Sequence, residues 1–75
     1  MTTVDCTGMM CPRPIIELAR AMEGIAVGGE VSLLADDPAA AVDVGAWCRL
    51  TGNTLVAATD AGDGVTRYVV RRAVP

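Results

Sequence analysis

The sequence predicts a two-layer α/β sandwich of the α+β type, with the order βαβαββ and both helices on one face of a four-stranded mixed sheet. Three observations predict this fold. A helical apolar period lies between two strand-like runs, a second helical stretch follows an Asp-Asp-Pro signal, and two β-rich runs close the chain. With 75 residues, the chain is expected to form one domain, residues 1–75.

The first half supplies a strand, a helix and a second strand. Thr2–Val4 is the expected first strand, and the helical period runs from Pro12 to Glu23. Gly24 ends that helix, and the short apolar run Val31–Ala35 is typical of a buried strand. The apolar side chains of the helix share one stripe that should face the sheet, formed by Ile15, Leu18, Ala19 and Met22.

The second half begins with a helix signal, since the Asp37 carboxylate can cap free N–H groups and Pro38 fits a first helical position. Because Asp43 offers a second cap and Gly45 is a poor helix former, we expect one turn, a break, and a helix over 44–51. The runs 54–59 and 65–72, joined by 60–64, predict a terminal hairpin.

Composition excludes several functions. Six arginines, no lysine and nine carboxylates give a net charge of −3, which does not suit binding to nucleic acid. Three cysteines without histidine cannot complete a structural zinc site, and we expect no metal. The chain has no apolar run of membrane-spanning length and no signal-like start, so we expect a cytoplasmic monomer that does not bind membranes.

The segment from Gly8 to Pro14 carries the chemistry. With Pro12 as the first helical residue, Cys11 becomes the N-cap, and its sulfur faces the positive end of the helix dipole with Arg13 nearby. Both effects favour the thiolate and predict a lowered pKa for a nucleophilic Cys11. The alternative is that Cys11 only replaces serine as a weak cap or fills a small gap.

The other two thiols allow blander interpretations. Cys6 lies five positions before Cys11, so it is either a resolving thiol or an inconsequential strand-end thiol. Cys48 is expected to be a small buried hydrophobic residue in the second helix. Arg71 and Arg72 end the last strand and are expected to be solvated edge charges.

The chain resembles the TusA/SirA-like small sulfur-carrier proteins, in which a Gly-Xaa-Xaa-Cys-Pro-Xaa-Pro motif opens the first helix. The resemblance continues over nearly the whole chain, and the matching positions include Asp5, Gly8, Cys11, Pro12, Pro14, Gly29, Glu30, residues 35–38, Asp43, Cys48, Arg49, Gly52 and Tyr68. It implies the same sandwich fold and a cysteine, matching Cys11, that carries sulfur as a persulfide.

We therefore expect a sulfurtransferase that accepts sulfane sulfur on Cys11 from a cysteine desulfurase or other donor and passes it to a downstream acceptor protein. Relatives serve tRNA thiolation, molybdenum cofactor synthesis and other sulfur metabolism. No cofactor is expected on this chain, because any pyridoxal phosphate belongs to the donor. The alternative is a regulatory or redox-sensing binding module without sulfur transfer. A dithiol oxidoreductase would need a Cys6–Cys11 bond.

Candidate docking residues surround the expected nucleophile. Met9, Met10 and Ile16 offer apolar side chains near the thiol, although the two methionines would equally well fill the small core. Arg20 on the first helix and Asp36 before the second are the charged candidates. Since Arg20 alternates with Glu17 along that helix, we expect docking to be weak and sensitive to salt.

Overall fold

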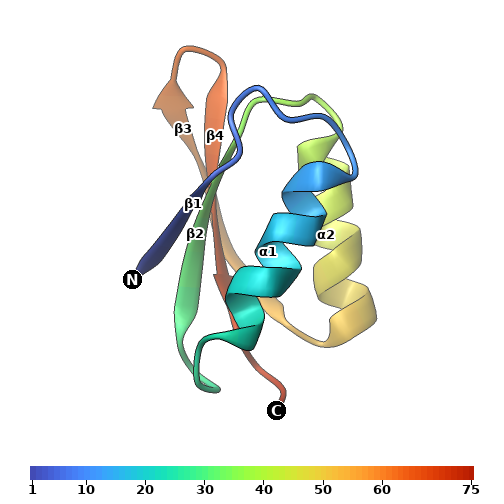
Figure 1. Ribbon diagram of the computed structural model, residues 1–75, viewed down its shortest axis with the longest axis vertical. Helices are drawn as coiled ribbons and strands as arrows, with labels where there is room; N and C mark the ends of the chain where they lie inside the picture. Colours follow the sequence, from blue (N-terminus) through green and yellow to red (C-terminus); the bar gives the residue numbers. More distant parts are fainter.

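The computed structural model describes residues 1–75 and has the predicted architecture, with two helices packed on one face of a four-stranded mixed sheet (Figure 1). The elements follow in the order β1 (Thr2–Asp5), α1 (Arg13–Glu23), β2 (Glu30–Ala35), α2 (Ala40–Thr51), β3 (Thr54–Gly62) and β4 (Val65–Arg71). The sheet order is β1-β2-β4-β3. β1 pairs parallel to β2, and the other pairs are antiparallel.

The core lies between the sheet and the helices. Alternate residues of β2 and β4 point toward the helices, and α1 covers them with Leu18 and Met22, both buried as its apolar stripe predicts. The largest fully buried side chains include Leu18, Leu33 and Val31. Because the core is aliphatic and small, each of these contacts supports the position of α1 and therefore of the loop before it.

α2 corrects the prediction of a broken second helix. The helix is continuous over Ala40–Thr51, and Asp43 and Gly45 lie inside it. Its buried residues Ala40, Val44 and Cys48 recur every fourth position and pack on the sheet, which outweighs the low helix propensity of glycine. The predicted cap is also corrected, because α2 begins two residues after Pro38 with Ala39 as its N-cap residue, and the Asp37 carboxylate accepts the Ala39 N–H at 3.1 Å in the turn before the helix.

The terminal hairpin is confirmed, with a longer first strand than predicted. β3 extends to Gly62, so Asp63 and Gly64 alone form the turn, both with positive φ. Two positive φ angles in a two-residue turn match the right-handed twist of a hairpin. No helix of the protein has the length and apolar character needed to cross a membrane.

Candidate functional site

Two loops meet at one end of the molecule and build the site. The loop between β1 and α1 runs beside the loop between β2 and α2 (Figure 1). The Asp36 carboxylate accepts the Gly8 N–H at 2.9 Å, and the Asp37 carboxylate accepts the Cys11 N–H at 2.7 Å. Gly8 has φ +79°, a conformation that side chains rarely adopt, which explains a glycine at this point of the motif. The two aspartates thus fix the backbone around Cys11.

The start of α1 corrects the predicted capping. Pro12, joined to Cys11 by a cis peptide bond, is the N-cap residue, and Arg13 and Pro14 are the first two helical residues. No side chain caps this end. The Arg13 N–H, expected to point at the Cys11 side chain, instead donates to the Met10 carbonyl at 2.9 Å. Because backbone and aspartate groups satisfy these donors, the Cys11 sulfur has no capping role.

Cys11 is the one exposed thiol among three free cysteines. Cys6 is fully buried within the core cluster, and burial raises the pKa of its thiol. That position fits the interpretation of Cys6 as an inconsequential strand-end thiol, since it lies in the core while Cys11 is exposed. Cys48 is buried as predicted, with a pKa raised by the same cause. Of the three, only Cys11 is accessible to a partner.

A shallow groove of about 270 Å³ opens beside Cys11, between the start of α1 and one face of α2. The thiol lies at a mostly apolar surface, and the groove is lined by Cys11, Pro12, Ile15, Asp43, Ala46, Trp47 and Leu50. Leu50 is 87% exposed and Val42, on the same helix, is 72% exposed. Apolar side chains left in water around a reactive group are typical of a protein contact surface.

The electrostatics of the groove correct the predicted pKa of Cys11. The neighbouring Asp43 carboxylate, partial desolvation and the negative charge of Asp37 raise the pKa of the Cys11 thiol above its ordinary value. The predicted lowering by Arg13 is not found at Cys11, and the charge of Arg13 acts instead to lower the pKa of Cys6. These carboxylates favour the thiol form of Cys11 over the thiolate.

The predicted docking residues have different environments. Met10 is 76% exposed and Ile16 is 45% exposed, whereas Met9 packs against the core. Arg20 is exposed and pairs with Glu17 at 3.3 Å. Asp36 is occupied within the chain, because its carboxylate accepts the Gly8 N–H.

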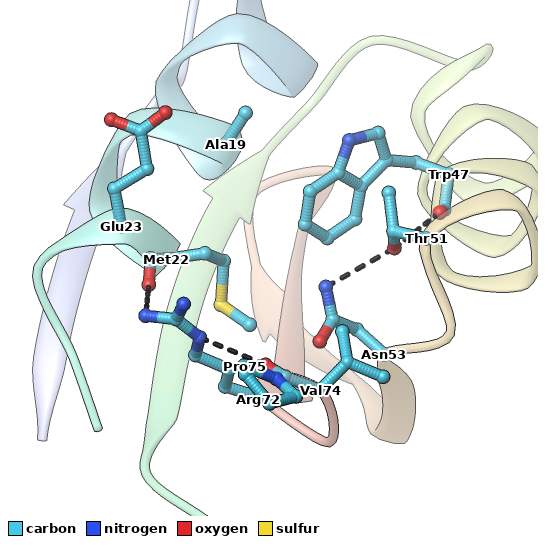
Figure 2. Close-up of a pocket in the computed structure, with 9 residues that line it drawn as sticks. All are labelled: Ala19, Met22, Glu23, Trp47, Thr51, Asn53, Arg72, Val74 and Pro75. Carbon is cyan, nitrogen blue, oxygen red and sulfur yellow. Dashed lines mark hydrogen bonds between the residues drawn. The ribbon is translucent and has the colours of Figure 1, made fainter. Parts of the chain in front are cut away.

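The opposite end of the groove between the helices holds a second hollow of about 290 Å³, shown in Figure 2. Here Arg72 corrects the prediction of a solvated edge charge. Its guanidinium donates to the carbonyls of Met22 at 3.1 Å and Ile25 at 2.6 Å, at the end of α1, and to that of Val74 at 3.0 Å. Arg71 behaves as predicted at an exposed edge, where it pairs with Glu30 at 2.9 Å.

Sequence reasoning missed the α2 side of the groove. Asp43, Ala46, Trp47 and Leu50 recur at the i, i+3, i+4 and i+7 spacing of one helix face. The signal was present in the sequence, but a helix broken before Val44 hides it, because Asp43 then belongs to a cap. Trp47 lines both hollows and lies between them.

The comparisons with known proteins agree with this geometry. The model of the family described as sulfurtransferase TusA matches residues 2–72. The chain belongs to the TusA family. A SirA-like protein from Desulfitobacterium hafniense has the same fold, with a TM-score of 0.86 over 99% of this chain and 100% of its own, at 23% identity.

Relatives of known sequence extend the match. A protein of Archaeoglobus fulgidus, named as an inferred sulfur carrier, is 42% identical over 71 residues, which cover 95% of this chain and 92% of the relative. A protein of Neisseria meningitidis serogroup A with the same description is 39% identical over 69 residues, 92% of each chain. These relationships support a role for this TusA-family chain as a sulfur carrier, which implies partners that give and receive sulfur.

Proposed function

We propose that the chain carries sulfur as a persulfide on Cys11, taken from a donor persulfide such as that of a cysteine desulfurase and passed to an acceptor in tRNA thiolation, molybdenum cofactor synthesis or another branch of sulfur metabolism. The observation that supports it best is the environment of the three thiols. Cys6 and Cys48 are buried, and Cys11 is exposed at the groove with its backbone held by Asp37.

The chemistry needs little beyond such a thiol. The sulfur of Cys11 attacks the terminal sulfane sulfur of the donor persulfide, a new S–S bond forms on Cys11, and the donor's S–S bond breaks with its electron pair on the departing thiolate. The oxidation level is unchanged overall, because one persulfide replaces another. In the second transfer, an acceptor nucleophile attacks the outer sulfur of Cys11, and the Cys11 thiolate leaves.

The surroundings of Cys11 suit the docking of a partner protein rather than the binding of a small substrate. The groove is shallow, with exposed apolar residues such as Ile16 and Leu50 at or beside its rim. We propose that Met10, Ile16 and Leu50 contact the donor and acceptor, with Arg20 contributing at the edge. Gly8, Pro12, Arg13 and Pro14 shape the backbone that presents the thiol. Met9 and Asp36 support this loop from within the chain.

The test is sulfur loading of wild type, Cys11→Ser and Cys48→Ala by several cysteine desulfurases supplied with cysteine. Mass spectrometry of the intact chain and of the peptide containing Cys11 reads the outcome. One added sulfur on Cys11, removed by a thiol reductant, is expected in wild type and in Cys48→Ala and is expected to be absent from Cys11→Ser. Equal loading of Cys11→Ser would refute the assignment of this cysteine, and a wild type that no donor loads would favour the regulatory module.

A further inference from the structure

Asp43 lies in the first turn of α2, where its charge complements the helix macrodipole, but no backbone N–H of the chain occupies its carboxylate. It lies inside α2, so it does not cap the helix, and neither of the two ion pairs of the protein includes it. The aspartates of the neighbouring loop differ in this respect. Asp36 accepts the N–H of Gly8, and Asp37 accepts those of Cys11 and Ala39. Of these three aspartates, only Asp43 has a carboxylate that no backbone N–H occupies, which leaves it free for a side chain in the groove.

The groove brings this carboxylate to Cys11. Asp43 is the one charged residue among the seven that line the groove, and the remaining lining is Cys11 and five apolar or aromatic residues. It is also half-buried, so water screens it less than a fully solvated carboxylate. A carboxylate that shares a mostly apolar groove with a thiol is well suited to accept the thiol hydrogen.

We infer that Asp43 controls the proton on Cys11: its carboxylate accepts the thiol hydrogen and keeps the unloaded carrier neutral until a donor docks. This inference rests on the proposed function and adds a residue to it. A neutral thiol reacts slowly with stray electrophiles, because the thiolate is the nucleophile. The Cys11 thiol of an unloaded carrier that moves between partners therefore stays unmodified until a donor docks.

The transfer step then balances through Asp43. When a protein persulfide docks, the Cys11 proton passes to the Asp43 carboxylate while the Cys11 sulfur bonds to the sulfane sulfur. The donor's S–S bond breaks, and its thiolate takes the proton back from Asp43. The other charge that bears on the Cys11 sulfur is that of Asp37, from the loop packed against it, and it acts in the same direction as Asp43. Arg13, at the start of α1, acts on Cys6.

The experiment measures the rate at which neutral iodoacetamide alkylates Cys11 as a function of pH, in the reduced full chain. Asp43→Asn keeps the shape of the side chain and removes its charge. Its profile should move to lower pH, with a rate at pH 7 roughly threefold above wild type, because a larger thiolate fraction is partly offset by lower intrinsic nucleophilicity. Asp43→Glu, which restores a carboxylate, should return the profile toward that of wild type.

Asp36→Asn is the matched control, since it removes one charge from the neighbouring loop and keeps an oxygen for the Gly8 N–H. Its profile should follow wild type. An Asp43→Asn profile that superimposes on wild type, or an equal shift in Asp36→Asn, would overturn the inference. Alkylation needs no donor, so this failure would leave persulfide loading of Cys11 standing, whereas loading of Cys11→Ser would refute the proposed function alone.

Discussion

The two ends of α1 are held by residues distant in sequence, and the charges that hold them are opposite. At the N-terminal end, Asp37 accepts the N–H of Cys11, 26 positions away. At the C-terminal end, Arg72 donates to the carbonyls of Met22 and Ile25, 50 and 47 positions away. Each charge complements the helix macrodipole, whose positive end lies at the N-terminus. At both ends, a charged side chain therefore hydrogen-bonds to backbone groups that the helix leaves without a partner.

The two ends differ in how much of the chain the charged side chain covers. The Arg72 side chain lies along the hollow at the end of α1 (Figure 2). Its guanidinium donates hydrogen bonds to the carbonyls of Met22 and Ile25. Asp37 reaches only the backbone of Cys11, so the sulfur stays exposed. The first arrangement closes a helix end, and the second fixes a residue without covering it. A residue that must meet partners needs the second arrangement.

The largest effect on stability is expected from removal of the Arg72 side chain at the C-terminal end of α1. Arg72→Ala removes the side-chain donors to the carbonyls of Met22, in α1, and Ile25, just after it, and leaves those groups partly buried, which should lower the free energy of unfolding by roughly 2 kcal/mol. Urea unfolding measures the loss. Arg71→Ala is the control, because its ion pair with Glu30 is exposed and should contribute less than about 1 kcal/mol.

The alkylation rate of Cys11 should be the same in Arg72→Ala as in wild type under conditions in which both are folded, because Arg72 lies at the other end of α1. Altered reactivity of Cys11 at unchanged fold would show that the two ends are coupled. Equal stabilities of the Arg71→Ala and Arg72→Ala variants would show that the helix end does not depend on the guanidinium.

Asp37→Asn tests the exposed end, with a smaller effect on stability. The N–H groups of Ala39 and Cys11 lower the pKa of Asp37 in the folded chain. Its contribution is therefore complete above the ordinary carboxyl pKa of 3.8 and is lost as the pH falls through the lower folded value. The variant should be less stable than wild type at pH 7, and its stability should fall less steeply in acid.

Urea unfolding over a pH series checks this sign, with Asp63→Asn in the hairpin turn as a surface control. The same acid dependence in Asp37→Asn and wild type would contradict it. Unlike Arg72→Ala, this variant should also change the alkylation of Cys11, because the charge of Asp37 helps to raise the pKa of that thiol. The two ends of α1 would then differ in function as well as in form.

The fold follows from local patterns, and this is why it could be predicted. The apolar stripe of α1, which includes Leu18 and Met22, is long enough to specify one helix face. The apolar run of β2 specifies one buried strand. The break in α2 was wrong because helix propensity is a weak guide where Ala40, Val44 and Cys48 pack on the sheet. Tertiary packing determined that element, and no short window of sequence contains it.

The site was predictable only in part for the same reason. The motif places Cys11 beside the start of α1, where it is found, but the N-cap residue is Pro12 rather than Cys11. The direction of its pKa was wrong, because Asp43 and Asp37 approach it from segments more than 25 positions away. Arg72 was misassigned likewise, since its carbonyl partners belong to the end of α1. Long-range contacts carry the charge balance at both ends of the helix.

The smallest expected effect concerns the solvated face between the two ends. Arg20 is 73% exposed, pairs with Glu17 at 3.3 Å and lies more than two turns from Cys11. If this face meets an acidic region of the donor, Arg20→Glu should slow sulfur loading about two- to threefold at low salt, with the difference vanishing as salt screens the charges. Alkylation of Cys11 by iodoacetamide should stay at the wild-type rate.

Glu17→Arg is the opposite charge change on the same face, and it should leave loading unchanged or make it faster. The measurement is the initial rate of persulfide formation with the physiological donor at two salt concentrations. A normal loading rate for Arg20→Glu at low salt would mean that this face of α1 does not meet the donor. The exposed side chain of Met10, in the loop that Asp36 and Asp37 hold, would then be the better candidate, because it belongs to the end of the helix where the thiol lies.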